Sequence, residues 1–289
     1  MAAEKYIFIS WPKTWWGIGQ YESRNFPQTL TQFLQALQKK KNVFTRLIHR
    51  LDKTSEEQSQ IYIMPDGVMY ADIPISDIEA VLRRYFDGLS DKHHYKQEAK
   101  SNYMFCCTHG KRDKCCAKFG LSVISEIERI SREQSFDIEV WECTHIGADR
   151  FAATAVVFPQ GYMYGRLRAD NCENVIKYLI KGYPYVPCFR GQLSVGFIEQ
   201  TALSFGHWYW YENEIENAEV TIDDLSQIGN EEYAAIVSVT DKLSKKRHSR
   251  HSLLIRKKEF STYNDCNAVK ARSIKKVARW IVAGSQQLD

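Results

Sequence analysis

Four of the eight cysteines in this chain lie in one short stretch, FCCTHGKRDKCCAKFG, at residues 105–120. They form two adjacent pairs that flank a charged loop containing a histidine. Further along, the segment WECTHIGADRFAA adds Cys143 and His145. Thiolate and imidazole groups that converge from two loops are typical of sites for a soft metal ion or an iron–sulfur cluster. Free cysteines are also common as small buried hydrophobic residues. The prediction of a metal or iron–sulfur site therefore depends on how the cysteines are paired and spaced, and not on their presence alone.

The two cysteine pairs occupy different kinds of local structure. Cys106 and Cys107 end a strand, where neighbouring side chains point to opposite faces, so only one of them can reach a given site. The second pair begins a helix predicted over Cys115–Gln134, and the free N–H groups there favour a thiolate. Asp113 is placed to cap this helix. The basic residues of the intervening loop either offset the charge of a thiolate-bound centre or belong to an ordinary solvated loop.

The spacing of the cysteines disfavours dithiol exchange. No two of them have the Cys-x-x-Cys spacing with which thioredoxin-type oxidoreductases hold both sulfurs at one helix N-terminus. The residues alone leave three alternatives open: an iron–sulfur protein, a structural zinc site or cluster-free binding module, and a cysteine-based redox sensor. Metal binding fits the spacing best.

The elements around these residues repeat along the chain. A strand, a helix, a strand, a hairpin and a closing helix follow one another, and the same order then recurs. Pro65 and Gly67 in the first hairpin recur as Pro159 and Gly161 in the second, each 94 residues later. This order is that of a thioredoxin-like fold. The sequence therefore predicts an α/β protein with two tandem thioredoxin-like units and a small β-rich C-terminal appendage.

The predicted domains differ in their cysteine content. All eight cysteines lie between Cys106 and Cys266, so the first unit is expected to be a packing partner without a site of its own. The expected domains are an N-terminal thioredoxin-like unit at 1–97, a thioredoxin-like unit with the Cys/His site at 98–205, and a β-rich extension at 206–289. Within the extension, Ser273–Val282 is predicted to form a short helix.

Composition limits the expected partners and location. The net charge of +4 on 289 residues is small, so neither a nucleic-acid nor a membrane partner is expected. The first residues lack a basic region followed by a long apolar run, and no stretch of about eighteen apolar residues predicts a membrane span. We therefore expect a cytoplasmic protein, in which metal binding or redox chemistry is favoured over a disulfide framework.

Three segments of the chain resemble a known family. They are CTHGKRDKCC at residues 107–116, HIGADRFAATAVVFPQGYMYGRL at 145–167 and, more loosely, FRGQLS at 189–194. They are similar to the sucrase/ferredoxin-like family, whose second half is a thioredoxin-like ferredoxin domain. The resemblance is clear over residues 5–205. Members with a characterised centre bind a [2Fe–2S] cluster through two Cys in a C-x-H-x-x-R-D-x-x-C loop and two His in H-I-G-G-H.

The resemblance implies a set of cluster ligands for this chain. Cys107 and Cys116 match the two cysteine ligands, and His145 matches the first histidine. The fourth position differs, because Asp149 stands where the family has its second histidine. A carboxylate is a harder ligand than imidazole and is uncommon on a [2Fe–2S] iron. Cys143 and Asp149 are therefore both candidates for the fourth ligand, and the absence of a cluster is the remaining alternative.

Other residues of the same motif are expected to support the ligands rather than bind the cluster. The resemblance assigns His109, Arg112 and Asp113 to this role, in which they hydrogen-bond or orient the ligands. The implied function is one-electron transfer with an unidentified redox partner protein, with zinc as the alternative cofactor. The family's name also contains a hydrolase, but the sequence singles out no carboxylate pair and contains no nucleophile motif that would support one.

Overall fold

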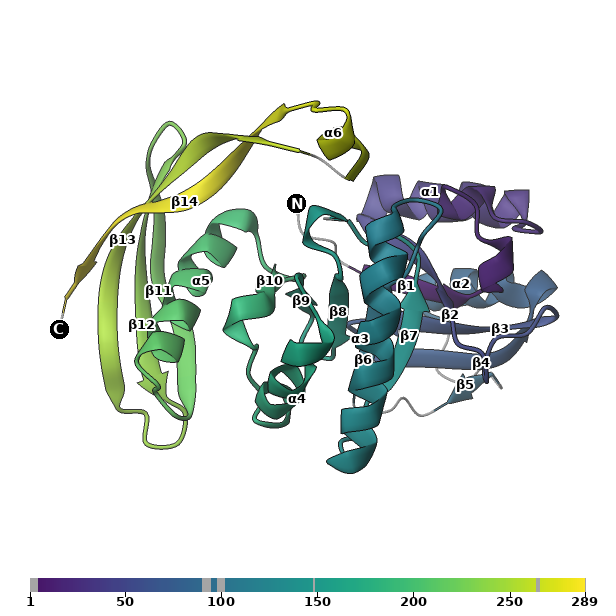
Figure 1. Cartoon of the computed structure of the whole chain (residues 1–289), viewed down its shortest axis with the longest axis horizontal. Helices are drawn as coiled ribbons and strands as arrows, with labels where there is room; N and C mark the ends of the chain where they lie inside the picture. Colours follow the sequence, from purple (N-terminus) through teal and green to yellow (C-terminus); the bar gives the residue numbers. More distant parts are fainter. Residues whose placement is uncertain (1–4, 90–94, 98–101, 148, 264–265, 289) are drawn as a thin grey trace. The chain divides into compact units, whose positions relative to one another are not determined.

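The computed structural model describes residues 5–89, 95–97, 102–147, 149–263 and 266–288. The chain divides into two compact units, Ala3–Leu193 and Ser194–Asp289, and each is described by itself (Figure 1). Within the described ranges, no helix has both the length and the apolar character needed to cross a membrane.

The first half of the unit Ala3–Leu193 has the predicted order of elements. Its strands and α-helices are β1 (Lys5–Ser10), α1 (Gln28–Lys41), β2 (Val43–His49), β3 (Gln58–Met64), β4 (Val68–Pro74), α2 (Ile78–Phe86) and β5 (Lys96–Gln97). Short 3-10 helices are η1 (Lys13–Trp15), η2 (Gln20–Glu22) and η3 (Ile75–Asp77). β1 pairs with β2 in parallel and with β3 antiparallel, so the strand order is β2-β1-β3-β4-β5.

The second half of this unit repeats the order and the pairing. Its strands and α-helices are β6 (Tyr103–Cys107), α3 (Lys114–Glu133), β7 (Glu139–Cys143), β8 (Ala155–Phe158), β9 (Tyr162–Tyr164), α4 (Cys172–Ile180) and β10 (Phe189–Gln192). Its 3-10 helices are η4 (Asp149–Phe151), η5 (Ala169–Asn171) and η6 (Val186–Cys188). β6 pairs with β7 in parallel and with β8 antiparallel. The resulting strand order is β7-β6-β8-β9-β10.

Glycines with a left-handed backbone occupy equivalent positions in the two halves. Gly67 and Gly161, in the two hairpins, have φ angles of 67° and 69°. Gly88 and Gly182, which follow the closing helices, have φ angles of 73° and 77°. Glycine adopts this region without the steric penalty of a Cβ atom. The sequence repeat thus reflects a backbone requirement at matching turns.

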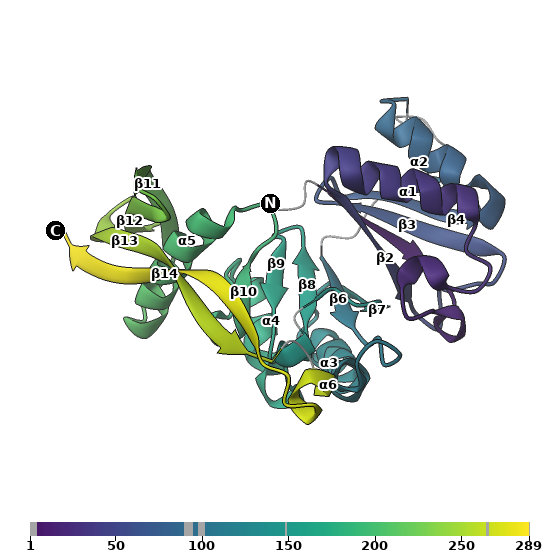
Figure 2. The same ribbon diagram turned by 90° about the horizontal axis from the view of Figure 1, so that it is seen from above.

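The two halves share one ten-stranded sheet, which is joined where Ile48 of β2 pairs with Cys143 of β7. Figure 2 shows α1 and α2 against the strands of the first half, and α3 and α4 against those of the second. The sheet faces that carry no helix pack on each other, with the rings of Phe8 and Phe105 stacked at 3.7 Å between centroids. The mixed α/β class is confirmed. Two separate tandem units are not confirmed, because both halves belong to one compact unit.

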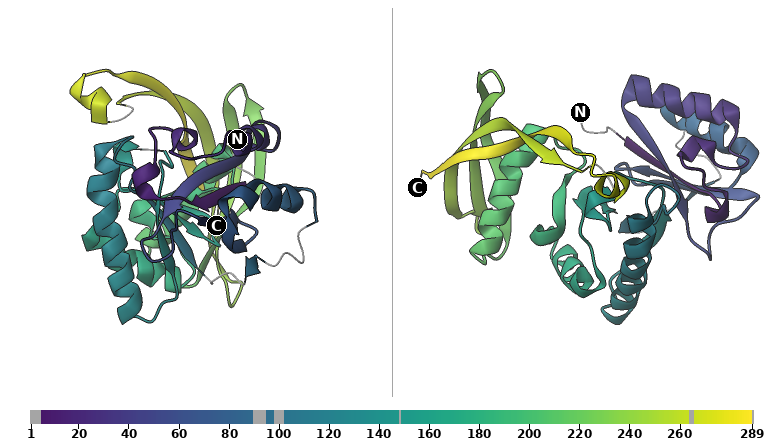
Figure 3. Two further views of the ribbon diagram at one scale, coloured as in Figure 1. Left: turned by 90° about the vertical axis from the view of Figure 1, so that its right-hand side faces the viewer. Right: turned by 45° about the horizontal axis from the view of Figure 1, so that its top comes forward.

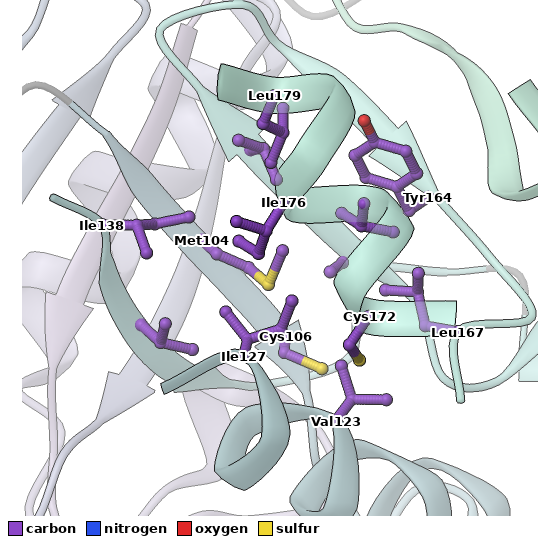
Figure 4. Close-up of a cluster of buried hydrophobic side chains, with 14 of the residues drawn as sticks. Met104, Cys106, Val123, Ile127, Ile138, Tyr164, Leu167, Cys172, Ile176 and Leu179 are labelled. Atoms are coloured by element: carbon purple, nitrogen blue, oxygen red, sulfur yellow. The ribbon is translucent and has the colours of Figure 1, made fainter. Parts of the chain in front are cut away.

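The three largest apolar clusters of the described residues in this unit fill these layers, and alternate residues of β6 face different ones. Figure 4 shows the cluster beneath α3 and α4, where Met104 and Cys106 of β6 meet Ile127 and Ile176 of the two helices. Phe105 instead lies in the cluster between the two half-sheets. A third cluster lies beneath α1 and α2. The alternation agrees with the prediction that adjacent cysteines of this strand point to opposite faces.

The unit Ser194–Asp289 is a helix packed on an antiparallel sheet (Figure 3). Its elements are α5 (Phe197–Glu212), β11 (Ala218–Gly229), β12 (Glu232–Asp241), β13 (Arg247–Thr262), α6 (Cys266–Lys270) and β14 (Lys275–Gln287). The strands pair in chain order, β11-β12-β13-β14. A separate β-rich C-terminal sheet is therefore present, as the sequence predicts.

The helix predicted at Ser273–Val282 is wrong. Residues Lys275–Gln287 form the strand β14, which pairs with β13 along most of its length. Trp280 and Val282 pack against the apolar cluster beneath α5. A short run of mixed periodicity takes its structure from cross-strand pairing and packing rather than from intrinsic preference, and neither of these can be read from the run itself.

Candidate metal centre

The loop between β6 and α3 places two cysteines close together. Cys107 is the last residue of β6, and Cys116 lies in the first turn of α3. The side chains of both are completely buried. The Oδ1 atom of Asp113 accepts a hydrogen bond from the backbone N–H of Cys115 at 2.7 Å, which confirms the predicted helix cap. The cap holds the first turn of α3 in place at the end of the strand.

A glycine lets α3 approach the end of β6 unusually closely. A Cβ atom on Gly120 would overlap the carbonyl oxygen of Cys107 and would lie 3.0 Å from Cγ2 of Thr108. The Sγ atom of Cys106 lies 3.8 Å from the carbonyl oxygen of Gly120. Gly120 belongs to no motif that the sequence shows. The available signal was a glycine inside an otherwise helical pattern, which is often retained for packing.

The second loop brings a histidine to the two cysteines. Cys107, Cys116 and His145 each place one ligand atom within 4.8 Å of the others. The Sγ atom of Cys107 lies 4.0 Å from Nδ1 of His145. The loops meet because β6 and β7 are parallel neighbours, in which Cys107 lies beside Cys143. Residues that follow the carboxyl ends of such strands share one edge of the sheet.

The surroundings of Cys107 favour its thiolate. A hydrogen bond with the Cys116 thiol lowers the pKa of Cys107 well below its ordinary value, although burial opposes this shift. Hydrogen bonds with the His145 side chain and the backbone N–H of His109 lower the pKa further. A thiolate is the form of cysteine that binds metals. The three residues therefore make up a soft N/S donor set suited to zinc or an iron–sulfur cluster.

Neither candidate for a fourth ligand belongs to this group of described side chains. Cys143 is completely buried and packs with Phe8 and Ile48 between the two half-sheets. Burial raises the pKa of the Cys143 thiol well above its ordinary value. Asp149 begins η4, but its side chain lies outside the described part of the structure. The identity of the fourth ligand stays a prediction.

His109 connects the two loops with the first half of the unit. Its Nδ1 atom accepts a hydrogen bond from the backbone N–H of His145 at 3.3 Å. Its Nε2 atom lies 2.8 Å from the carbonyl oxygen of Gly17, and since Nδ1 is an acceptor, Nε2 carries the proton and donates. Burial is the main factor that lowers the pKa of His109, so the ring is neutral near pH 7. His109 positions the backbone of His145 and is not one of the three grouped ligands.

Segments from the first half and from β7 also hold the loop between β6 and α3. The Nζ atom of Lys111 donates to the carbonyl oxygen of Trp16 at 2.5 Å. The hydroxyl of Thr108 donates to Glu142 at 2.6 Å, and Glu142 also pairs with Lys13. These contacts could not be predicted, because the first half has no cysteine and nothing in its sequence indicates a contribution to the site.

A pocket of about 190 Å³ lies beside His145. Its lining comes from the loop after β1, from β2 and from the two loops of the site. The lining residues are Ile18, Gly19, Gln20, Arg46, His109, Arg112, Thr144 and His145. Arg112, which was expected to support the ligands, therefore lies on the wall of this pocket.

Curated relatives match part of the chain. The protein named Altered inheritance of mitochondria protein 32 from Clavispora lusitaniae is 21% identical over 141 residues, covering 45% of this chain and 52% of that protein. The protein of the same name from Debaryomyces hansenii is 21% identical over 104 residues, covering 34% and 38%. The chain thus spans about half the length of the first relative and less of the second.

Solved structures of a thioredoxin-like [2Fe–2S] ferredoxin from Aquifex aeolicus are also similar to part of the chain. One is 17% identical, covers 32% of this chain and 94% of that chain, and has a TM-score of 0.29. A structure of the wild type is 14% identical, covers 32% and 100%, and has the same TM-score of 0.29. The similarity covers about a third of this chain.

The family comparison covers more of the sequence. The model of the sucrase/ferredoxin-like family matches residues 1–191, which is more than half of the 289 residues. The matched region contains both loops of the site, with Cys107, Cys116 and His145. The chain therefore belongs to the sucrase/ferredoxin-like family.

Proposed function

We propose that this protein binds a [2Fe–2S] cluster at the Cys/His group and carries single electrons. The observation that supports this most directly is the convergence of three soft donor atoms within 4.8 Å from two separate loops. Cysteine sulfur and histidine nitrogen are the donors found on [2Fe–2S] irons. Membership of the sucrase/ferredoxin-like family supports the same assignment.

The proposed ligands divide between the two loops. Cys107 and Cys116 would hold one iron, because they lie at adjoining ends of β6 and α3. His145 would hold the other iron together with a fourth residue. The packing and the raised thiol pKa of Cys143 argue for Asp149 in that position. We therefore expect Asp149→Ala to lose the cluster and Cys143→Ser to keep it. The reverse result would assign the fourth position to Cys143.

The residues around the site would shield and orient a bound cluster, which would supply a one-electron redox couple. Both cysteines are completely buried and exclude water from the sulfur side. His145 is partly exposed, so electrons would enter and leave on the histidine side, where a partner protein can approach. The identity of that partner, the cytoplasmic location and the expected lack of nucleic-acid and membrane partners remain predictions.

Anaerobic purification followed by iron and acid-labile sulfide analysis tests the proposal. We expect about two irons and two sulfides per chain in the full-length protein. Cys107→Ser and Cys116→Ser should each abolish both. Cys172→Ser is the matched control, because Cys172 is equally buried but begins α4 and belongs to a different apolar cluster. A folded protein that contains neither element, even after reconstitution with iron and sulfide, contradicts the proposal.

The spacing of the donor atoms favours zinc as the second candidate. All three lie within 4.8 Å of one another, and one sulfur–nitrogen distance is 4.0 Å. Such a compact set can surround a single tetrahedral ion with bond lengths of about 2.0–2.3 Å. Stoichiometric zinc without sulfide, lost in both Cys107→Ser and Cys116→Ser, would establish a zinc site in place of the cluster.

A further inference from the structure

We propose that the pocket beside His145 binds a small anion that carries a carboxylate or phosphate group. Arg46 and Arg112 line the pocket, and none of its described lining residues is acidic. Its volume of about 190 Å³ is smaller than the roughly 300–1,000 Å³ typical of sites for larger ligands. The pocket therefore suits inorganic phosphate or a small dicarboxylate rather than a nucleotide.

Arg46 provides a positive charge that no carboxylate neutralises within the described ranges. Its Nη1 atom donates to the carbonyl oxygen of Thr45 at 2.6 Å and lies 3.3 Å from Oε1 of Gln20. Its Nε atom is buried and has no hydrogen-bond partner among the described residues. A buried donor without an acceptor is unfavourable. An anion in the pocket would place a negative charge beside this guanidinium.

Two further donors reach the pocket from the loops of the site. Arg112 is exposed, and its guanidinium forms no ion pair with the described residues. Thr144 is only 1% exposed, and its hydroxyl accepts a hydrogen bond from the backbone N–H of Leu47 at 2.9 Å. The hydroxyl proton is therefore available to an acceptor in the pocket. Two guanidinium groups and a hydroxyl form a donor set that matches carboxylate or phosphate oxygens.

The remaining polar side chains distinguish this pocket from the metal centre. Both ring nitrogens of His109 already form hydrogen bonds, one with Gly17 and the other with His145. His109 therefore lines the pocket but is not expected to bind the anion. Arg46 and Arg112 would repel a second metal cation. The pocket and the metal centre share His145, so an anion in the pocket would lie next to the proposed cluster ligand.

Isothermal titration calorimetry tests the proposal. The cluster-free protein of 289 residues is titrated with inorganic phosphate and, separately, with succinate. We expect saturable binding of at least one titrant above a sodium chloride control at matched ionic strength. Arg46→Gln and Arg112→Gln should each weaken that binding about 10-fold or more, because each removes charge-assisted hydrogen bonds. Arg132→Gln removes an equal charge from an exposed position near the end of α3 and should change the affinity by less than about twofold.

The outcomes distinguish a specific anion-binding site from nonspecific electrostatic attraction. Binding of phosphate alone or of succinate alone identifies which group the pocket accepts. Absence of saturable binding by either titrant overturns the proposal, and so does equal weakening by Arg132→Gln. Arg46→Lys keeps the charge but not the planar donor set, and it replaces Arg46→Gln in the test if that variant does not fold. Because the protein is cluster-free, the result does not depend on whether the cluster proposal holds.

Discussion

Replacing Gly120 with alanine is expected to change the spacing of the two site cysteines. The added Cβ atom would overlap the carbonyl oxygen of Cys107 and would lie 3.2 Å from its carbonyl carbon and 3.0 Å from Cγ2 of Thr108. Most of these neighbours are backbone atoms, which cannot rotate away. Relief therefore requires α3 to move away from the end of β6 by about 1 Å, a displacement large enough to spoil a preorganised site.

Two opposing effects determine how much stability Gly120→Ala loses. Forcing an extra methyl group into a packed contact typically costs about 1–3 kcal/mol. Replacing glycine with alanine inside a helix contributes about 1 kcal/mol in the other direction. We expect a net loss of up to about 2 kcal/mol, which corresponds to a Tm decrease of up to about 4–8 °C for a unit of this size.

The effect of this substitution on the site is expected to exceed its effect on stability. Cys116 lies one helical turn before Gly120 and moves with α3, whereas Cys107 stays with β6. A binding site requires its ligands to be held within about 0.5 Å of their productive positions. Gly120→Ala should therefore fold but retain little iron and sulfide.

Two measurements on the same preparations test this prediction. Urea unfolding of the cluster-free protein reports stability, and iron and sulfide content after anaerobic reconstitution reports the site. Ser122→Ala is the matched control, because Ser122 is exposed on the same helix and alanine favours the helix there without a clash. Wild-type iron content and an unchanged urea midpoint in Gly120→Ala would refute the idea that the close contact of α3 and β6 sets the sulfur spacing.

Further predictions concern residues that support the site and the sheet. His109→Ala removes the donor to Gly17 and should lower the iron content after reconstitution. His109→Gln should restore part of that content. Equal iron content in both variants and the wild type would exclude a positioning role for His109. Glu139→Ala leaves the buried indole N–H of Trp141 without its acceptor and should lower the free energy of unfolding by about 3 kcal/mol in urea titrations. Burial acts to raise the pKa of Glu139, but hydrogen bonds led by that from Lys53 lower it below 4.5 overall. The stability difference between wild type and Glu139→Ala should therefore be fully present above about pH 4.5 and shrink as the pH falls through the folded-state pKa; a difference that does not vary with pH would contradict this.

Local patterns predicted the elements that carry the site. The helix predicted over Cys115–Gln134 is α3, Lys114–Glu133, and Asp113 caps it. Strand alternation correctly separated Cys106, which faces the helices, from Cys107. These predictions succeeded because a cap, a helical period and a strand period each depend on residues a few positions apart.

Predictions failed or were absent where long-range packing determines the structure. The strand β14 takes its conformation from pairing with β13, so its own periodicity indicated a helix in error. Gly120 matters because α3 lies against Cys107, and a lone glycine in a helical pattern does not reveal what it contacts. Cys143 lies beside Cys107 on the neighbouring strand and packs with residues of both half-sheets, a set of contacts that its own sequence neighbours do not indicate.

The residue types and local periodicities of the chain identify its element order, its internal repeat and its sulfur and imidazole donors. Which of these donors meet depends on how the two half-sheets pack. That packing brings Gly17 to His109, buries Cys143 among apolar side chains of both half-sheets, and places Arg46 and Arg112 on one pocket. These contacts join segments far apart in the chain, and their closeness results from the burial of two apolar sheet faces against each other, which no local pattern encodes.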